Sequence, residues 1–321
     1  MARRSQLRPV PPPGLVSEIA SQSSRPVASS LAALVGFLQE RFGDSLVGVM
    51  LYGSCLHTDD PTDGIVDLYA VVDEYRNAYP ERLLRAGNAW LPPNVFYVEK
   101  TDHDTMLRAK YAVLSLEHLE EGASRWFHSY VWARFAQPVR VLYVRDENSR
   151  ERIHRALAQA VLTFLRSCVP ALDCVEMDAE AIWTQSLTLT YASELRAERD
   201  RARRLTEVNL DDYSRITAAA APGLVGQLEV LPGARYRRMA DERDRRRVSR
   251  RWRLRRWQGR VLSIMRLSKA VFTFRDSVDY AAWKIERHTG VQIDVTPRMR
   301  RYPLLLGPRV LWMLLRRGTL R

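Results

Sequence analysis

Cysteine, lysine and long apolar runs are scarce in this chain of 321 residues. Its three cysteines have neither the spacing of a metal site nor the number that a disulfide framework needs, which fits a reducing compartment. No apolar run approaches the ~20 residues of a membrane-spanning helix. Hydrophobic residues nevertheless make up 46% of the chain, which excludes a wholly disordered protein. A chain of this length has room for two domains.

Arginine replaces lysine almost entirely, and the basic residues are unevenly distributed. Only four of the 50 basic residues are lysines. Residues 235–321 hold 25 basic and 7 acidic residues, a net charge of +18, whereas residues 1–234 hold 25 and 30, a net charge of −5. Such segregation predicts an anionic partner, either nucleic acid or an anionic membrane. A solvated basic face without a partner is the alternative.

Apolar periodicity predicts an α+β protein. Prolines and serines indicate a flexible arm over residues 1–30. A helix over residues 31–42 and five strands predict one domain at 31–147, the strands being expected at 47–52, 66–72, 94–99, 111–116 and 139–144. Helical patterns at 150–168, 179–204 and 240–287 predict a mainly helical domain over 148–297, before a basic amphipathic tail at 298–321.

The segment "LYGSCLHTDDPTDGIVDLYAVVD", residues 51–73, carries the most specific pattern. Gly53 lets the backbone approach a phosphate, Ser54 can donate a hydrogen bond to it, and Asp67 can hold Mg²⁺. The nucleotidyltransferase superfamily places Gly-Ser after one strand and two alternate carboxylates on the next. The pattern therefore resembles that superfamily, and we expect a nucleotidyltransferase-like mixed sheet. Tyr69 stands where the second carboxylate is expected.

A second metal ligand must then come from elsewhere. Asp73 lies six residues beyond Asp67, about 20 Å along a strand, which is too far for one ion. Glu99, at the end of the next predicted strand, is the first choice. Acids in the loop between the first two strands are the alternatives, namely Asp59, Asp60 and Asp63.

The stretch "YGSCL…VDLYAVVDEYRNAYP" resembles the mitochondrial-type CDP-diacylglycerol synthases, the translocator assembly and maintenance family. That family's motif also has an aromatic residue where Tyr69 stands. Three later segments resemble it in the same order, through Lys110, Tyr111, Ser115, Arg134 and Pro138, then Tyr191, Glu194 and Arg196, then Lys269, Ser277, Tyr280 and Lys284. Cys55, Ala112 and Glu194 depart from the family pattern, and the segment before Lys110 is shortened.

The resemblance implies a reaction between CTP and phosphatidate that gives CDP-diacylglycerol and pyrophosphate with Mg²⁺. It implies catalytic roles for Asp67 and Lys110. The predicted metal ligands are Asp67 and Glu99, the latter chosen from its place at a strand end. Contacts to the nucleotide are expected from Tyr52, Gly53, Ser54, Lys110 and Arg134.

Apolar residues among the arginines favour a membrane as the anionic partner. Residues 304–321 are too short to span a bilayer and suit a helix lying in its interface. Contacts to lipid are expected from Arg253, Trp257, Lys269, Trp312, Arg316 and Arg317, with Trp252 beside them. We expect a peripheral protein on the cytoplasmic face of a bacterial inner membrane, or on the matrix side of the mitochondrial one.

Two other functions stay open at this point. One is a nucleotidyltransferase that acts on RNA or another phosphorylated acceptor. The other is an inactive scaffold at the membrane surface, in which Tyr69 marks a lost site. The apolar tail makes RNA the less favoured partner, and no DNA partner is expected.

Overall fold

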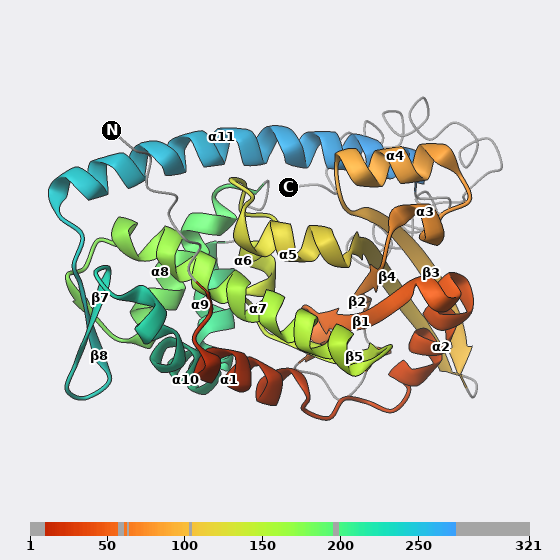
Figure 1. The fold of residues 1–321 in the computed structure, drawn as a ribbon, viewed down its shortest axis with the longest axis horizontal. Coiled ribbons are helices and arrows are strands. Elements are labelled where there is room, and N and C mark those ends of the chain that lie inside the picture. Colours follow the sequence, from red (N-terminus) through yellow and green to blue (C-terminus); the bar gives the residue numbers. More distant parts are fainter. Residues whose placement is uncertain (1–9, 57–60, 63, 103–104, 195–198, 274–321) are drawn as a thin grey trace, which may run out of the picture.

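The computed structural model describes residues 10–56, 61–62, 64–102, 105–194 and 199–273. They form the predicted α+β fold, in which a five-stranded mixed sheet precedes a mainly helical region. Figure 1 shows the sheet on the right, the later helices on the left, and α11 running along one side of both. Several predicted features lie outside the described residues: Asp59, Asp60, Asp63, Arg196, Ser277, Tyr280, Lys284 and the tail at 298–321 with Trp312, Arg316 and Arg317.

The sheet has the strand order β3-β4-β2-β1-β5. Its strands are β1 (Leu46–Tyr52), β2 (Val66–Val72), β3 (Asn94–Asp102), β4 (Thr105–Ser115) and β5 (Val139–Val144). β2 and β4 run parallel, and the other neighbouring pairs of this sheet are antiparallel. The ranges of β2 and β5 match the prediction, whereas β4 begins at Thr105 rather than at residue 111.

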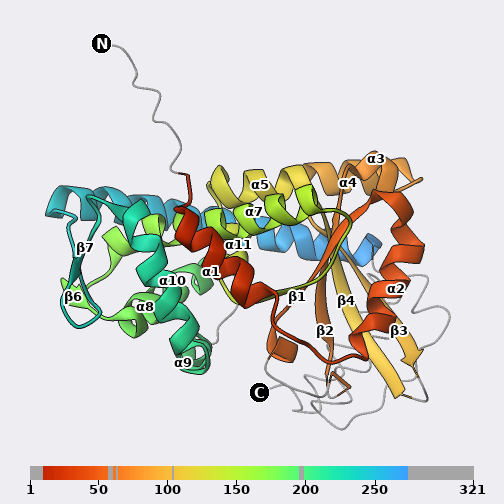
Figure 2. The ribbon, with the colours of Figure 1, turned by 60° about the horizontal axis from the view of Figure 1, so that its bottom comes forward.

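Helices cover both faces of the sheet, which explains why β1 and β2 are apolar almost throughout. On one face, α2 (Leu31–Phe42) buries four side chains at helical spacing, the positions 31, 34, 38 and 42 that the sequence places together. The opposite face packs against α5 (Leu116–Ser124), α6 (Trp132–Phe135) and α7 (Glu147–Cys168). Figure 2 shows α2 and α7 on opposite sides of the strands.

The helical region shares a hydrophobic core with the sheet. Tyr69 and Val71 of β2 lie in the same buried cluster as Leu157 and Phe164 of α7 and Trp183 of α8 (Ala179–Tyr191). The predicted boundary at residue 147 therefore divides the chain by type of element and does not separate two cores.

Beyond α8 the structure is more divided than predicted. The helix expected over 179–204 is two helices, α8 and α9 (Arg199–Val208), and α10 (Leu210–Ala220) follows. A small sheet of order β6-β8-β7 was not predicted; its strands are β6 (Glu176–Met177), β7 (Leu228–Leu231) and β8 (Arg235–Arg238). The Pro232-Gly233 turn separates β7 from β8, with Gly233 at a φ of 73°. The short helices α3 (Tyr75–Ala78) and α4 (Arg82–Trp90) follow β2.

The predicted flexible arm is wrong for residues 13–23, which form helix α1 (Pro13–Ser23). Proline is tolerated in the first turn of a helix, because the N–H that it lacks has no partner there. Leu15 and Ile19, one turn apart, are buried in the main core. The apolar spacing thus prevails over the prolines and serines around it.

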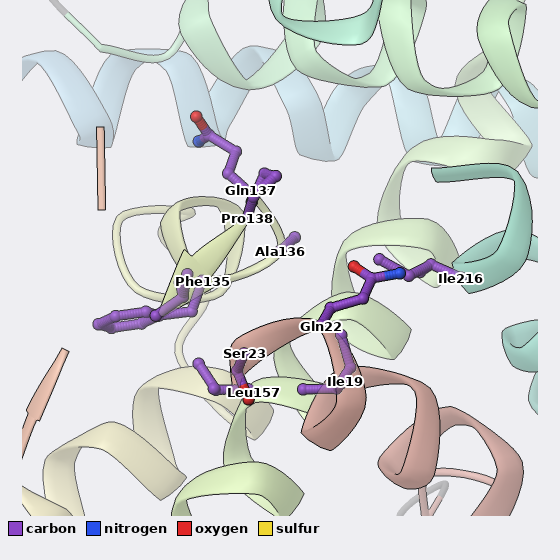
Figure 3. Close-up of a pocket in the computed structure, with 10 residues that line it drawn as sticks. Ile19, Gln22, Ser23, Phe135, Ala136, Gln137, Pro138, Leu157 and Ile216 are labelled. Carbon is purple, nitrogen blue, oxygen red and sulfur yellow. The ribbon is translucent and has the colours of Figure 1, made fainter. Parts of the chain in front are cut away.

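α1 is held against the helical region by packing and by charge. Figure 3 shows Ile19 of α1 near Leu157 of α7 and Ile216 of α10, around a small crevice. Beyond the helix, the Arg25 guanidinium donates two hydrogen bonds of 2.6 and 2.7 Å to the Asp212 carboxylate of α10. These contacts join the N-terminal helix α1 and the residues after it to α10.

Helix α11 (Glu242–Thr273) ends beside α4, as Figure 1 also shows. There the Lys269 ammonium donates hydrogen bonds to the carbonyl oxygens of Gly87 at 3.2 Å, Pro93 at 3.0 Å and Leu91. Burial, with the nearby Arg266 charge, lowers the pKa of Lys269 to about 8. The predicted lipid contact of Lys269 is therefore replaced by a cap on the last carbonyls of α4.

Gly259 provides a test of how closely α11 is packed. A Cβ added at this glycine would lie 2.3 Å from the Ser193 carbonyl oxygen, whereas one added at Gly36 in α2 would meet nothing within 4 Å. We expect Gly259→Ala to lower the free energy of unfolding by about 1–3 kcal/mol. The matched change Gly36→Ala should raise it by about 0.5–1 kcal/mol, since alanine favours the helix. Denaturant titration measures both, and equal effects would contradict the close contact.

Candidate functional site

The Gly53-Ser54 turn lies at the end of β1, directly opposite Asp67 at the start of β2. Tyr52 and Asp67 are paired across the two strands. Gly53 has a φ of 90°, and a Cβ on it would lie 3.0 Å from Asp67 Oδ2. Both the backbone conformation and the space therefore call for glycine here. The turn presents Ser54 as an exposed residue next to this carboxylate.

Lys110 is the second charged group at this end of the sheet. It pairs with Asp67 in the parallel register of β2 and β4, so both side chains lie on the same face. Lys110 Nζ lies 3.2 Å from Asp67 Oδ1, and the two side chains are 29% and 25% exposed. A half-buried pair in contact with solvent can exchange its partner for a bound phosphate at modest cost.

Arg134 of α6 extends a cation over the same strand end. Its guanidinium carbon lies 5.3 Å from the centre of the Tyr52 ring and 5.2 Å from that of Tyr130. Arg134 Nη2 is 3.6 Å from a carboxylate oxygen of Glu194, just beyond α8. Its Nε is buried and has no hydrogen-bond partner among the described residues. The structure thus brings Arg134 to Tyr52 and leaves one of its donors unused.

Tyr69, which replaces the expected second carboxylate, has a packing role. Its ring is buried between Tyr52 and Phe135, with ring centres 5.0 and 4.7 Å away. Burial raises the pKa of Tyr69 well above its usual value, so the phenol keeps its proton. Tyr69 supports Tyr52 and α6 from beneath.

Glu99 is not brought to Asp67, contrary to the predicted metal pair. Lys110 on β4 is opposite Tyr97, and Glu99 is opposite Arg108, so the whole of β4 stands between Glu99 and β2. The Glu99 carboxylate instead accepts hydrogen bonds from Tyr97 at 2.7 Å and from Arg108 at 3.3 Å. The shared metal site predicted for the two acids does not form in this arrangement.

Asp67 still suits Mg²⁺ as one ligand. Mg²⁺ is commonly held by one or two carboxylates together with phosphate oxygens and water, and rarely by a cage of protein groups. In the described part of the chain, no three side chains of the metal-ligating types gather at one point. The donor set fits an ion that arrives with a nucleotide and takes Asp67 as its protein ligand.

The predicted lipid contacts on α11 divide between its two sides. Trp252 is buried, and its indole N–H donates to the Ser167 carbonyl at 3.0 Å, so it is a core residue. Arg253 is exposed, and Trp257 is 66% exposed. Trp257 belongs to an exposed apolar row at helical spacing, which consists of Leu254, Trp257, Val261 and Ile264. Arg253 and Arg260 lie within this part of the helix and are also exposed.

His128 is half-buried beside Arg255 and Arg266 of α11, and it makes the free energy of unfolding depend on pH. Burial, reinforced by the Arg266 and Arg255 charges, lowers the pKa of His128 from 6.5 to about 3. The unfolded chain therefore takes up this proton first as the pH falls, and stability is lost from about pH 6.5 downward. Between pH 6.5 and 5, the free energy of unfolding should fall by about 2 kcal/mol more in wild type than in His128→Gln. Urea titrations of both proteins at the two pH values test this, and equal losses would contradict it.

Sequence reasoning missed two residues that the structure places around Arg134. Tyr130 lies beneath Arg134 and also beneath Arg266, whose guanidinium carbon is 4.0 Å from its ring centre. No local pattern marks either residue, because α6 and α11 meet only in the folded chain.

No protein-family model matches this chain, and no curated protein matches it at a significant level.

Proposed function

We propose that the site at Gly53, Asp67 and Lys110 transfers a nucleotidyl group from CTP to a phosphate monoester, with phosphatidate as the acceptor. The observation that carries the proposal is the contact of Gly53 with Asp67, beside Lys110, at the ends of adjacent strands. This chemistry needs a backbone that admits a phosphate, a carboxylate that can hold Mg²⁺, and a cation that offsets phosphate charge. CTP and phosphatidate themselves rest on the family resemblance of the sequence.

In this reaction an oxygen of the acceptor phosphate forms a bond to the α-phosphorus of CTP. The bond from that phosphorus to the bridging oxygen breaks, and pyrophosphate leaves with the electron pair. A phosphate monoester is already anionic, so no strong general base is required, and the rate depends on position and charge neutralisation.

The protein groups divide this work. Ser54 and the backbone at Gly53 hold the triphosphate, and Lys110 moves from Asp67 to phosphate oxygens when the nucleotide binds. Arg134, whose guanidinium lies over the Tyr52 ring, adds positive charge beside the phosphates. Mg²⁺, when bound, offsets the negative charge that develops on the phosphates. Asp67 is the residue that would hold it.

A location at a membrane surface follows from the same proposal. Within the described ranges, none of the helices combines the length and the apolar character that a bilayer crossing requires. The exposed row Leu254, Trp257, Val261 and Ile264 among arginines is typical of a helix that lies on an anionic bilayer. We infer a peripheral protein on the cytoplasmic face of a bacterial inner membrane, or on the matrix side of the mitochondrial one.

The test is a panel of acceptors and nucleotides. The full chain is incubated with Mg²⁺, each of the four ribonucleoside triphosphates, and vesicles containing phosphatidate or another lipid phosphate. We expect pyrophosphate release and a nucleotidyl lipid with CTP and phosphatidate, and little product with ATP. Nucleotide addition to RNA in place of lipid would contradict the acceptor, and absence of product with every pair would contradict the activity.

A further inference from the structure

A basic concavity lies under the first half of α11, away from the Gly53 turn. This groove has a volume of about 520 Å³ and lies between α11, the last turns of α7 and the residues that follow α5. Its charged lining residues are Arg125, Arg166, Arg247, Arg251, Arg255 and Asp244. We call it the arginine groove. Trp132 of α6 also lines it, whereas Arg134 of the same helix contacts Tyr52, so α6 lies between the two sites.

The buried Arg255 and the half-buried Arg166 of the groove are held by neutral groups. Arg255 donates from Nε to the Phe127 carbonyl at 2.7 Å, and its guanidinium carbon lies 4.5 Å from the centre of the Trp252 ring. Arg166 donates to the Gly223 carbonyl at 3.0 Å. Burial lowers the pKa of Arg255 only to about 10, so it is charged at neutral pH. These contacts fix the two side chains without neutralising them.

Two of the exposed arginines of the groove also lack a partner of opposite charge. Arg247 and Arg251 form no ion pair with any described residue, and Arg125 has only a surface pair with Glu121 at 2.9 Å. Arg247, Arg251 and Arg255 are spaced by four residues, so they stack on one side of α11 at about 6 Å intervals. Like charges at this spacing repel, and an anion bound along the row would relieve the repulsion.

We propose that the arginine groove is a second anion-binding site, for a ligand that carries two or more phosphate groups. Guanidinium groups bind phosphate with paired hydrogen bonds, and a concave wall of one charge concentrates the field on the ligand. The volume is that of a small-molecule site, and a row of three arginines spans about 12 Å, which is longer than one phosphate. The site is distinct from the proposed catalytic one and does not depend on it.

The phosphates can come from a soluble polyphosphate or from lipid headgroups, so the test has two arms. In the first, tripolyphosphate is titrated calorimetrically into the full chain. In the second, the chain is sedimented with phosphatidylcholine vesicles that contain phosphatidylglycerol. Both arms compare wild type with Arg247→Gln/Arg251→Gln. In the tripolyphosphate arm, Arg260→Gln is the matched control, an exposed α11 arginine outside the groove.

We expect the double change to weaken tripolyphosphate binding about tenfold or more, and Arg260→Gln to leave it within about twofold. A Lys110→Met variant should still bind tripolyphosphate at the arginine groove. This result would separate binding at the groove from nucleotide binding at Asp67. Loss confined to the vesicle arm would assign the phosphates to lipid headgroups. The proposal fails if the double variant binds in both arms as wild type does, or if Arg260→Gln weakens tripolyphosphate binding as much as the double change does. Because Arg247 and Arg251 are exposed, the variants should fold, and thermal melting checks this.

Discussion

Asp67→Asn should lower nucleotidyl transfer at saturating CTP and Mg²⁺ by about 10³-fold or more. Asparagine keeps the size of the side chain and removes the negative charge, so it cannot hold Mg²⁺ as Asp67 would. The fold should survive, because the ion pair that is lost, Asp67 with Lys110, is partly exposed and is worth about 1 kcal/mol or less. Steady-state rates and thermal melting of the same samples measure the two effects.

Two matched changes sharpen this test. Asp73→Asn removes a carboxylate just after β2 that, among the described residues, accepts hydrogen bonds only from Glu74 and Asn77, and it should leave turnover nearly unchanged. Glu99→Gln should do the same if Glu99 only pairs with Arg108. A loss at Glu99 as large as that at Asp67 would restore the metal pair expected from the sequence. Near-normal turnover in Asp67→Asn would remove Asp67 from the site.

Arg134→Leu should lower the free energy of unfolding by about 3 kcal/mol or more and also abolish most activity. Arg134 and Glu194 are only 11% and 15% exposed, so removing the cation leaves a carboxylate in a poorly solvated place. Leucine also gives up the contacts of the guanidinium with the rings of Tyr52 and Tyr130. Denaturant titration and the Michaelis constant for CTP are the measurements.

A double change separates stability from phosphate binding. Arg134→Leu/Glu194→Leu removes both charges and should recover part of the lost stability, because no unpaired charge is left. Activity should not return if Arg134 contacts phosphate. Recovery of both stability and activity would make Arg134 a purely structural residue, and a single-variant cost below about 1 kcal/mol would contradict the burial of the pair.

The sequence predicts the sheet well because its central strands are buried on both faces. Val66–Val72 is such a strand, and its range agrees with β2; Val139–Val144, at the edge of the sheet, also agrees with β5 because it is a short run rich in valine. α1 was missed because prolines and serines around it outweighed the helical spacing of Leu15 and Ile19. A local pattern of turn residues is a poor guide where distant segments, here α7 and α10, supply the packing.

The candidate site was only partly predictable for the same reason. Gly53 and Asp67 are linked by strand pairing between neighbouring elements, which the sequence can suggest. Lys269 was expected to contact lipid, yet its partners are carbonyls of residues 87–93, far away along the chain. Tyr69 looks like a missing acid in the sequence and is a buried ring in the structure. Burial and partners distant in sequence determine the roles of Lys269 and Tyr69, and a local sequence motif predicts neither.

The most direct test of the central proposal follows two labels in CTP. The full chain is incubated with Mg²⁺, phosphatidate vesicles and CTP labelled with ³²P at either the α or the γ phosphate. Nucleotidyl transfer at Asp67 predicts that the α label enters the lipid, that the γ label appears only in pyrophosphate, and that Asp67→Asn abolishes both. Entry of the γ label into lipid would show phosphoryl transfer instead, and an α label that stays in water-soluble products would contradict transfer to lipid.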